Sequence, residues 1–357
     1  MELCLYDPAL GYYSRSREQF GKAGDFYTSS DVHAVFGRLL ARQFEEMWQA
    51  LDLPPQIEIL ELGPGRGLFA RDVLDWSQKK FPEFFAALKY TLQESSPALR
   101  AKLEETLHEH IASGKAKVPE ERPTSLYRAL GEEAPLILFA NEFFDALPVE
   151  ILSARGKLHL AFEAGHLTEI WLPPTAPELE FLDRYSTHPE AESNERVEVP
   201  LAAQQWTAAI ASHIRRGFLV AIDYGYTRAQ QLAGRHRGTL MAYRQHSTSP
   251  NPYEAPGEQD LTAHVNFTAL TAALEQAGMQ PRELVTQSQF LMGIGERTQF
   301  AEAFEECRLP QEHAKVALQL KYLISPTGMG ETFQVLVASH GVELGRVAAL
   351  SGLRFGR

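Results

Sequence analysis

Three glycines at alternate positions are the residues of this chain best suited to holding a ligand. Gly63, Gly65 and Gly67 follow an apolar run that ends at Leu62, and apolar residues then recur at helical spacing from Leu68. The pattern predicts a strand, a glycine turn and a helix, which open a doubly wound parallel sheet whose ligand lies beyond the first strand. Glycine is needed where the backbone approaches a ligand or takes a positive φ, because a Cβ atom would intrude there.

The spacing of these glycines indicates which ligand the turn fits. The dinucleotide fingerprint is Gly-x-Gly-x-x-Gly, whereas here Leu68 stands at the last position and the third glycine comes one residue early. The spacing Glu61-x-Gly-x-Gly-x-Gly is instead similar to the first motif of class I methyltransferases, which use S-adenosylmethionine (SAM). The second strand should then end in a carboxylate for the two ribose hydroxyls, and Glu94 supplies one. A purely structural turn is the alternative, and Glu94 favours SAM over it.

A second group of polar side chains follows the most apolar segment of the chain, residues 136–140. Asn141, Glu142 and Asp145 come directly after it, so we expect them at the carboxyl end of a central parallel strand, where ligands bind. If the chain turns helical there, Glu142 and Asp145 share one face at positions i and i+3. The alternative is that Asn141 and Asp145 only cap the next helix, which leaves a glutamate directly after a buried strand unexplained.

The rest of the sequence predicts alternating helices and strands, interrupted by a group of short antiparallel strands. Helices are predicted over residues 32–51 and 97–112, with Asp31 and Ser96 as N-caps, and from Asn266 to Ala277. A third short strand is predicted near Leu126 to Ala129. Short antiparallel strands are predicted at residues 149–152, 158–162 and 167–172, and an antiparallel edge of the main sheet near residues 333–339.

The amino-acid composition limits which partners, metals and locations the protein can have. The net charge of −12 argues against a nucleic-acid substrate, because phosphate contacts need a basic surface. The two cysteines, Cys4 and Cys307, give neither a disulfide framework nor a zinc site, so we expect no metal. The first residues include the acidic Glu2 and Asp7 and lack the apolar stretch of a signal peptide, so no signal peptide is predicted. No apolar run is long enough to span a bilayer. These features predict a cytoplasmic protein without membrane insertion.

Taken together, the motifs resemble the MidA-type SAM-dependent methyltransferases, the family of the mitochondrial complex I assembly factor that methylates a protein arginine. Two segments are the most specific, Asn-Glu-Phe-Phe-Asp-Ala-Leu-Pro and Gly-Glu-x-Asp-Leu-Thr-Ala-His. The matching segments, in the family's order over nearly the whole chain, are Tyr6–Tyr13, Gly24–Ser29, Phe36-Gly37, Glu61–Gly67, Ala140–Pro148, Asp223–Gly225 and Pro256–Phe267.

The resemblance implies a class I, Rossmann-like α/β fold and a set of site residues. The segment that contains Asp25 and Thr28 belongs to the active-site region in the family, although the residues alone favour an N-terminal helical wrap without chemistry. The expected catalytic residues are Glu142, Asp145 and Asp25. The expected cofactor-binding residues are Glu61, Gly63, Pro64, Gly65, Gly67, Glu94, Asn141 and Thr28. Whether Asp260 and His264 are catalytic or structural stays open.

The expected organisation has an N-terminal loop and helical lid at residues 1–55 and a SAM-binding core at 56–148. An inserted β/helical segment follows at 149–215. The rest of the sheet spans 216–357, with a substrate-side insertion at about 226–265. The expected reaction is methyl transfer from SAM to an arginine nitrogen of a protein, with carboxylates such as Glu142 and Asp145 gripping the guanidinium. The alternatives are a small-molecule methyltransferase and a SAM-binding assembly or scaffold protein; the glycine spacing disfavours a nicotinamide oxidoreductase.

Overall fold

The computed structural model describes residues 1–15, 34–119, 134–163, 165–191, 193–234, 238–244, 247–249 and 251–355. The chain divides into two compact units, each described here by itself. Unit 1 comprises Met1–Phe26, Phe143–Ala209 and Tyr224–Gln276, and unit 2 comprises Tyr27–Glu142, Ile210–Asp223 and Ala277–Arg357. The strand expected near Leu126 to Ala129 and the cap expected at Asp31 lie outside the described residues.

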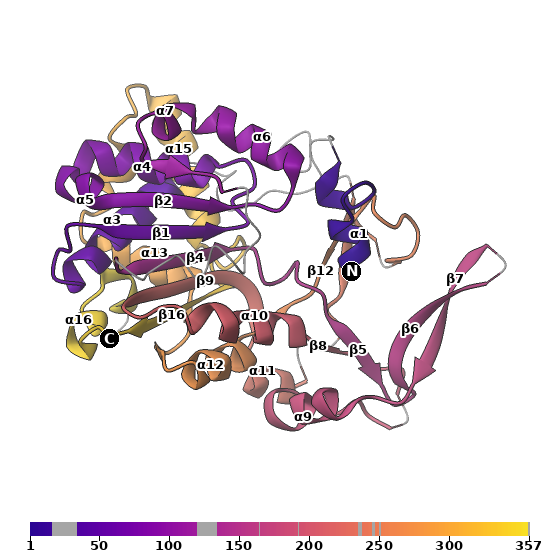
Figure 1. The fold of residues 1–357 in the computed structure, drawn as a ribbon. Coiled ribbons are helices and arrows are strands. Elements are labelled where there is room, and N and C mark those ends of the chain that lie inside the picture. Colours follow the sequence, from indigo (N-terminus) through magenta and orange to yellow (C-terminus); the bar gives the residue numbers. More distant parts are fainter. Residues whose placement is uncertain are drawn as a thin grey trace. The chain divides into compact units, whose positions relative to one another are not determined.

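A mostly parallel sheet is the centre of unit 2 (Figure 1). Its strands follow the order β14-β16-β9-β4-β1-β2-β3, with β15 also on β16, and β1 pairs in parallel with both β2 and β4. The expected doubly wound α/β fold and its antiparallel edge are confirmed, because β14 and β15 run antiparallel to β16. The strands are β1 Ile57–Leu62, β2 Leu88–Gln93, β3 Ala116–Lys117, β4 Leu136–Asn141, β9 Gly217–Tyr226, β14 Gln280–Pro281, β15 Val285–Thr286 and β16 Phe333–His340. The last three residues of β9, from Tyr224 on, belong to unit 1.

Helices cover this sheet through apolar side chains. Phe44 of α3 and Phe69 of α4 both contact Phe139 of β4, with ring centroids 5.5 Å and 4.5 Å away. Helix α3 buries most of its length, so it is a core helix, whereas the sequence predicted part of a lid. The helices of unit 2 are α3 Val35–Ala50, α4 Leu68–Lys80, α5 Pro82–Ala87, α6 Pro97–Thr106, α7 His108–Ala112, α13 Gln287–Glu296, α14 Ala301–Phe304, α15 Pro310–Ile324, α16 Leu344–Ala348 and η2 Ser351–Leu353.

Unit 1 contains two small antiparallel sheets, with strand orders β7-β6-β5-β8 and β11-β10-β12. The three antiparallel strands expected between residues 149 and 172 are confirmed as β5, β6 and β7. The elements are α1 Glu2–Tyr6, η1 Tyr12–Ser14, β5 Glu150–Ser153, β6 Gly156–Glu163, β7 His166–Leu172, α9 Ala176–Tyr185, β8 Val197–Val199, α10 Leu201–Ala211, α11 Arg228–Leu232, β10 Met241–Arg244, β11 Ser247–Ser249, β12 Asp260–Thr262, β13 Val265–Asn266 and α12 Phe267–Gln276. In the part of the chain that the structure describes, no helix is long and apolar enough to cross a bilayer.

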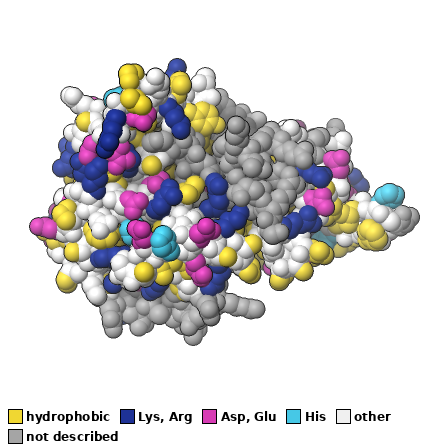
Figure 2. Space-filling view, turned by 90° about the horizontal axis from the view of Figure 1, so that it is seen from above, with side chains coloured by type: hydrophobic (Ala, Val, Ile, Leu, Met, Phe, Trp, Pro, Cys, Tyr) yellow, Lys and Arg dark blue, Asp and Glu magenta, His cyan; other side chains and the backbone are white. Residues whose placement is uncertain are grey.

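The β6–β7 hairpin carries apolar side chains on its surface. Phe162 is 73% exposed and Leu160 is 48% exposed, and Ile170 and Leu172 of the partner strand are exposed as well. Figure 2 shows hydrophobic side chains gathered on the surface that this hairpin forms.

Candidate functional site

The strand register of unit 2 brings three predicted site residues to one edge of the sheet. Leu62, the last residue of β1, pairs with Gln93 of β2 on one side and Ala140 of β4 on the other. The residues that follow these three are Gly63, Glu94 and Asn141, so they lie at the same carboxyl edge. The Gly63 amide donates a hydrogen bond to the Gln93 carbonyl oxygen at 3.0 Å, which ties the start of the glycine turn to β2.

All three glycines of the turn take a positive φ. The angles are 60° at Gly63, 54° at Gly65 and 76° at Gly67, a region that side chains with a Cβ rarely adopt. Packing also requires a glycine at position 67, because a Cβ atom there would lie 2.6 Å from the Leu103 Cδ2 atom of α6. The turn that the glycine spacing predicted is confirmed, and Gly67 is its structural end, since it precedes the first residue of α4.

Two buried glutamates near the glycine turn, Glu61 in β1 and Glu94 after β2, have raised pKa values. Burial raises the pKa of Glu61 to about 8, although the Tyr90 hydroxyl donates to Glu61 Oε2 at 2.8 Å and opposes the shift. Burial also raises the pKa of Glu94 to about 7, against hydrogen bonds from the backbone amides of Ser96, Ser95 and Gly65. The Gly65 amide thus faces the Glu94 carboxylate, so the glycine turn and the end of β2 meet.

Asn141 and Glu142 end β4 in a strained turn. Glu142 has φ 50°, which costs a residue with a Cβ about 1–2 kcal/mol and is uncommon outside glycine and asparagine. Its amide donates to the Ile222 carbonyl oxygen at 2.9 Å, and Asn141 Nδ2 donates to Glu142 Oε1 at 3.1 Å. The Asn141 Oδ1 atom is buried and finds no partner among the residues that the structure describes. Such outliers concentrate at functional sites, where surrounding contacts hold them.

Asp145 belongs to unit 1 and does not cap a helix. The chain makes a turn after β4 and continues to β5, so neither the capping of a following helix nor the helical i, i+3 arrangement with Glu142 is formed. Asp145 is 5% exposed, and the Tyr224 hydroxyl of β9 donates to its Oδ2 atom at 2.5 Å. Burial raises the pKa of Asp145 to about 6, and the Tyr224 hydrogen bond opposes that shift.

Around Asp145, unit 1 gathers tyrosines that the sequence did not single out as site residues. The Tyr13 hydroxyl donates to Asp260 Oδ1 at 3.0 Å, and Tyr6 stacks on Tyr13 with centroids 5.7 Å apart. The ring of His264 meets the ring of Tyr224 edge to face at 5.4 Å. Asp260 and His264 thus contact tyrosines of this cluster. The signal for these tyrosines was their place inside the segments Tyr6–Tyr13 and Asp223–Gly225, on which the family resemblance rests.

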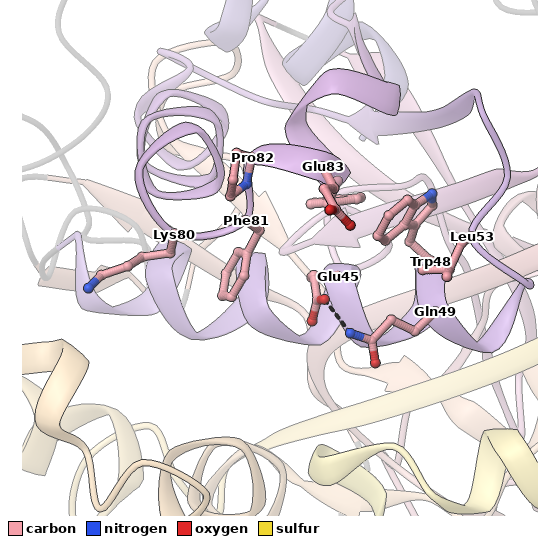
Figure 3. Close-up of a pocket in the computed structure, with 9 residues that line it drawn as sticks. Glu45, Trp48, Gln49, Leu53, Lys80, Phe81, Pro82 and Glu83 are labelled. Carbon is pink, nitrogen blue, oxygen red and sulfur yellow. Dashed lines mark hydrogen bonds between the residues drawn. The ribbon is translucent and has the colours of Figure 1, made fainter.

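Asp25 and Thr28, the remaining predicted site residues, lie outside the described residues. A hollow of about 550 Å³ does occur in unit 2, at the end of α3 and the junction of α4 with α5 (Figure 3). It lies near the residues that lead into β1, at the amino end of the strand, whereas ligands of open α/β sheets bind at the carboxyl ends. Its lining residues are Glu45, Trp48, Gln49, Leu53, Lys80, Phe81, Pro82, Glu83 and Phe84.

The carboxyl edge of the sheet fits a SAM molecule chemically. The three left-handed glycines of the turn offer backbone positions without a side chain, and Glu94 offers a buried carboxylate for the ribose hydroxyls. The buried Asn141 Oδ1 atom has no donor among the described residues, and the amino group of the methionine portion would provide one. When bound, SAM supplies an electrophilic methyl group on its sulfonium.

Comparison with known proteins agrees with this chemistry. Residues 39–285 match the family described as "Putative S-adenosyl-L-methionine-dependent methyltransferase". The chain belongs to this family. A crystal structure from Burkholderia thailandensis bound to S-adenosyl-homocysteine is similar over 100% of this chain and 89% of that one, with a TM-score of 0.81 and 28% identity. The expected SAM-dependent methyltransferase fold, activity and cofactor are thereby confirmed, as is the resemblance to the MidA type.

Relatives of this methyltransferase carry a more specific name. The mitochondrial protein arginine methyltransferase NDUFAF7 of Danio rerio is 30% identical over 94% of this chain and 81% of its own length. Its homolog in Drosophila melanogaster is 29% identical over 96% of this chain and 80% of its own length. Both names place the relatives in mitochondria, so the cytoplasmic location predicted from the sequence is wrong.

Proposed function

We propose that this methyltransferase transfers the methyl group of SAM to a nitrogen of an arginine side chain in a protein substrate. The names of the Danio rerio and Drosophila melanogaster relatives support an arginine of a protein as the acceptor. The net charge of −12 is compatible with a cationic acceptor.

One observation carries the proposal: the carboxylate of Glu142 stands at the carboxyl end of β4, on a backbone held at φ 50°. Glu142 follows Asn141 in the sequence, and the register of β4 with β1 and of β1 with β2 aligns Asn141 with Gly63 and Glu94 along the carboxyl edge of the sheet. A left-handed glutamate is unfavourable for the fold, and a functional requirement at this position explains why it is kept.

A carboxylate at this place suits a guanidinium chemically. The guanidinium group stays protonated at neutral pH, and its planar set of donors matches a carboxylate. Glu142 can hold the positive charge on two of the nitrogens and leave the third to face the methyl group. The rate would come from positioning and electrostatic stabilisation.

The test is methyl transfer with radiolabelled SAM and a proteome extract, followed by amino-acid analysis of the labelled protein. We expect label in methylarginine, and a Glu142→Gln variant that keeps SAM affinity but transfers roughly a hundredfold more slowly in a single turnover. Glu104→Gln changes an exposed glutamate on α6 and is the matched control, which should behave as the unmodified protein. Label only in small molecules, or an unchanged rate for Glu142→Gln, contradicts the proposal.

A further inference from the structure

The Asp145 carboxylate in unit 1 is held by a tyrosine that no part of the proposed function yet uses. The Tyr224 hydroxyl donates to Asp145 Oδ2 at 2.5 Å, and the Asp145 carbonyl oxygen accepts from the Ala263 amide at 2.9 Å. The next residue, His264, packs its ring against Tyr224 at an interplanar angle of 83°. Residues from two distant segments, Tyr224 and the pair Ala263–His264, therefore hold the loop that carries Asp145.

The N-terminal segment stabilises the same loop from another direction. The Tyr6 hydroxyl donates to the carbonyl oxygen of Ala146, the residue after Asp145, at 2.9 Å. Tyr6 in turn stacks on Tyr13, whose hydroxyl donates to Asp260. The carbonyl oxygens of Asp145 and Ala146 are thus both held by hydrogen bonds, and the Asp145 side chain is held by Tyr224.

The groups that face Asp145 come from each of these elements. They are Tyr224 of β9, Tyr243 of β10 and Tyr13 of η1; Asp260 of β12 acts on Tyr13 and Tyr243, and His264 packs against Tyr224. Burial raises the pKa of Tyr13 and of Tyr243, and the negative charges of Asp145 and Asp260 raise it further, so these two tyrosines stay neutral hydroxyl groups near pH 7.

We propose that Tyr224 is a positioning residue of the transfer reaction: its hydroxyl group holds the Asp145 carboxylate in the orientation in which that carboxylate accepts the proton lost by the acceptor nitrogen. This inference rests on the proposed arginine methylation. As the nitrogen–carbon bond forms, the carbon–sulfur bond breaks and its electron pair goes to sulfur. The methylated nitrogen loses one proton, so the product keeps the single positive charge of a guanidinium, and Asp145 takes that proton before it passes to water.

The protonation equilibrium of Asp145 suits this role. With its pKa raised to about 6, Asp145 is ionised at neutral pH and is a stronger proton acceptor than an ordinary aspartate. The Tyr224 hydrogen bond favours the ionised form. Tyr224→Phe removes that bond and keeps the ring that contacts His264, so the pKa of Asp145 should rise further.

The experiment measures the Asp145 titration and the reaction in the same variants. Carboxyl ¹³C NMR, assigned with Asp145→Asn, gives the pKa of Asp145 in the protein without SAM, and a pH profile of kcat gives the acid limb of the reaction. In Tyr224→Phe we expect both midpoints to move to higher pH together. At pH 6.5 kcat should fall about tenfold, with recovery by pH 8 and an unchanged KM for SAM. Tyr253→Phe is the control, because Tyr253 donates to Glu169 at 2.7 Å in the same unit, and we expect neither midpoint to move.

Two results overturn the inference while leaving arginine methylation intact. An Asp145 pKa that rises without a shift of the acid limb makes Tyr224 purely structural. An Asp145 pKa that does not change shows that the hydroxyl group does not control the carboxylate. A wild-type protein that methylates no arginine overturns the proposed function instead, and the inference with it, even when the NMR midpoint moves.

Discussion

The backbone amide of Gly65 donates a hydrogen bond to the carboxylate of Glu94. This contact joins the glycine turn after β1 to the end of β2, two segments about thirty residues apart in the sequence. It means that the turn and the carboxylate form one structural unit before any ligand arrives, which is the preorganisation that tight binding needs.

Gly65 should be essential for SAM binding. A Gly65→Val change adds a side chain at φ 54°, on the turn that faces the expected ligand, and we expect no detectable SAM binding by calorimetry in a protein that remains folded. Gly114→Val is the matched control: Gly114 has φ 69° but nothing within 4 Å of its Cβ position. Gly114→Val should introduce backbone strain without entering ligand space, so we expect a lower melting temperature and an unchanged affinity for SAM. Unchanged affinity in folded Gly65→Val would place SAM elsewhere.

Glu94 should control both the strength and the pH dependence of SAM binding. Hydrogen bonds to a charged acceptor contribute roughly 1.5–3 kcal/mol, so Glu94→Ala should weaken binding by about ten- to a hundredfold. Because the pKa of Glu94 is raised to about 7, the carboxylate becomes protonated below that pH and is then a poorer acceptor. SAM affinity should therefore rise with pH through 7 in the wild type, and Glu94→Gln should lose this part of the dependence. A loss smaller than threefold in Glu94→Ala contradicts the ribose role.

Glu61 should make the protein without SAM less stable as the pH rises. Its pKa is about 8 in the folded state and 4.5 in the unfolded chain, so the folded state binds more protons between these values. The free energy of unfolding then falls as the pH increases across that window and levels off above about 8. In Glu61→Gln, thermal melts at pH 5.5, 7 and 8.5 should show a flatter dependence. Glu104→Gln should keep the wild-type slope, and equal slopes in all three proteins would contradict the assignment.

Local signals in the sequence were sufficient for the elements that position the cofactor edge. Ser96 caps α6 through its side chain, with Leu99 N donating to Ser96 Oγ at 3.2 Å, as the Ser-Pro pair indicated. Asn266 caps α12 in the same way, with Ala269 N donating to its Oδ1 atom at 3.0 Å. Such caps depend on residues three positions apart, which a single sequence shows directly.

The acceptor side of the site depends on contacts that no local pattern contains. Tyr13 and Asp260 meet across 247 positions of the chain, and Tyr224 and Asp145 across 79. The same tertiary contacts hold the turn at Asp145, where capping chemistry had indicated a helix start. The family resemblance marked the segments that contain Tyr13 and Tyr224, but the contacts of their hydroxyl groups with buried carboxylates are seen only in the structure.

The strain at Glu142 gives a prediction that separates stability from activity. Glycine adopts a left-handed φ without the clash of a Cβ atom, so Glu142→Gly should raise the free energy of unfolding by up to about 1 kcal/mol, less the loss of the Asn141 hydrogen bond, and should abolish transfer. Gln299→Gly is the matched control, because Gln299 has φ 52° on an exposed turn. It should gain similar stability and keep full activity. Chemical denaturation and single-turnover transfer measure the two quantities in each variant. The contrary outcome is a free energy of unfolding that falls in Glu142→Gly by more than it rises in Gln299→Gly. Glu142 would then stabilise the fold, and its left-handed backbone would carry no argument for function.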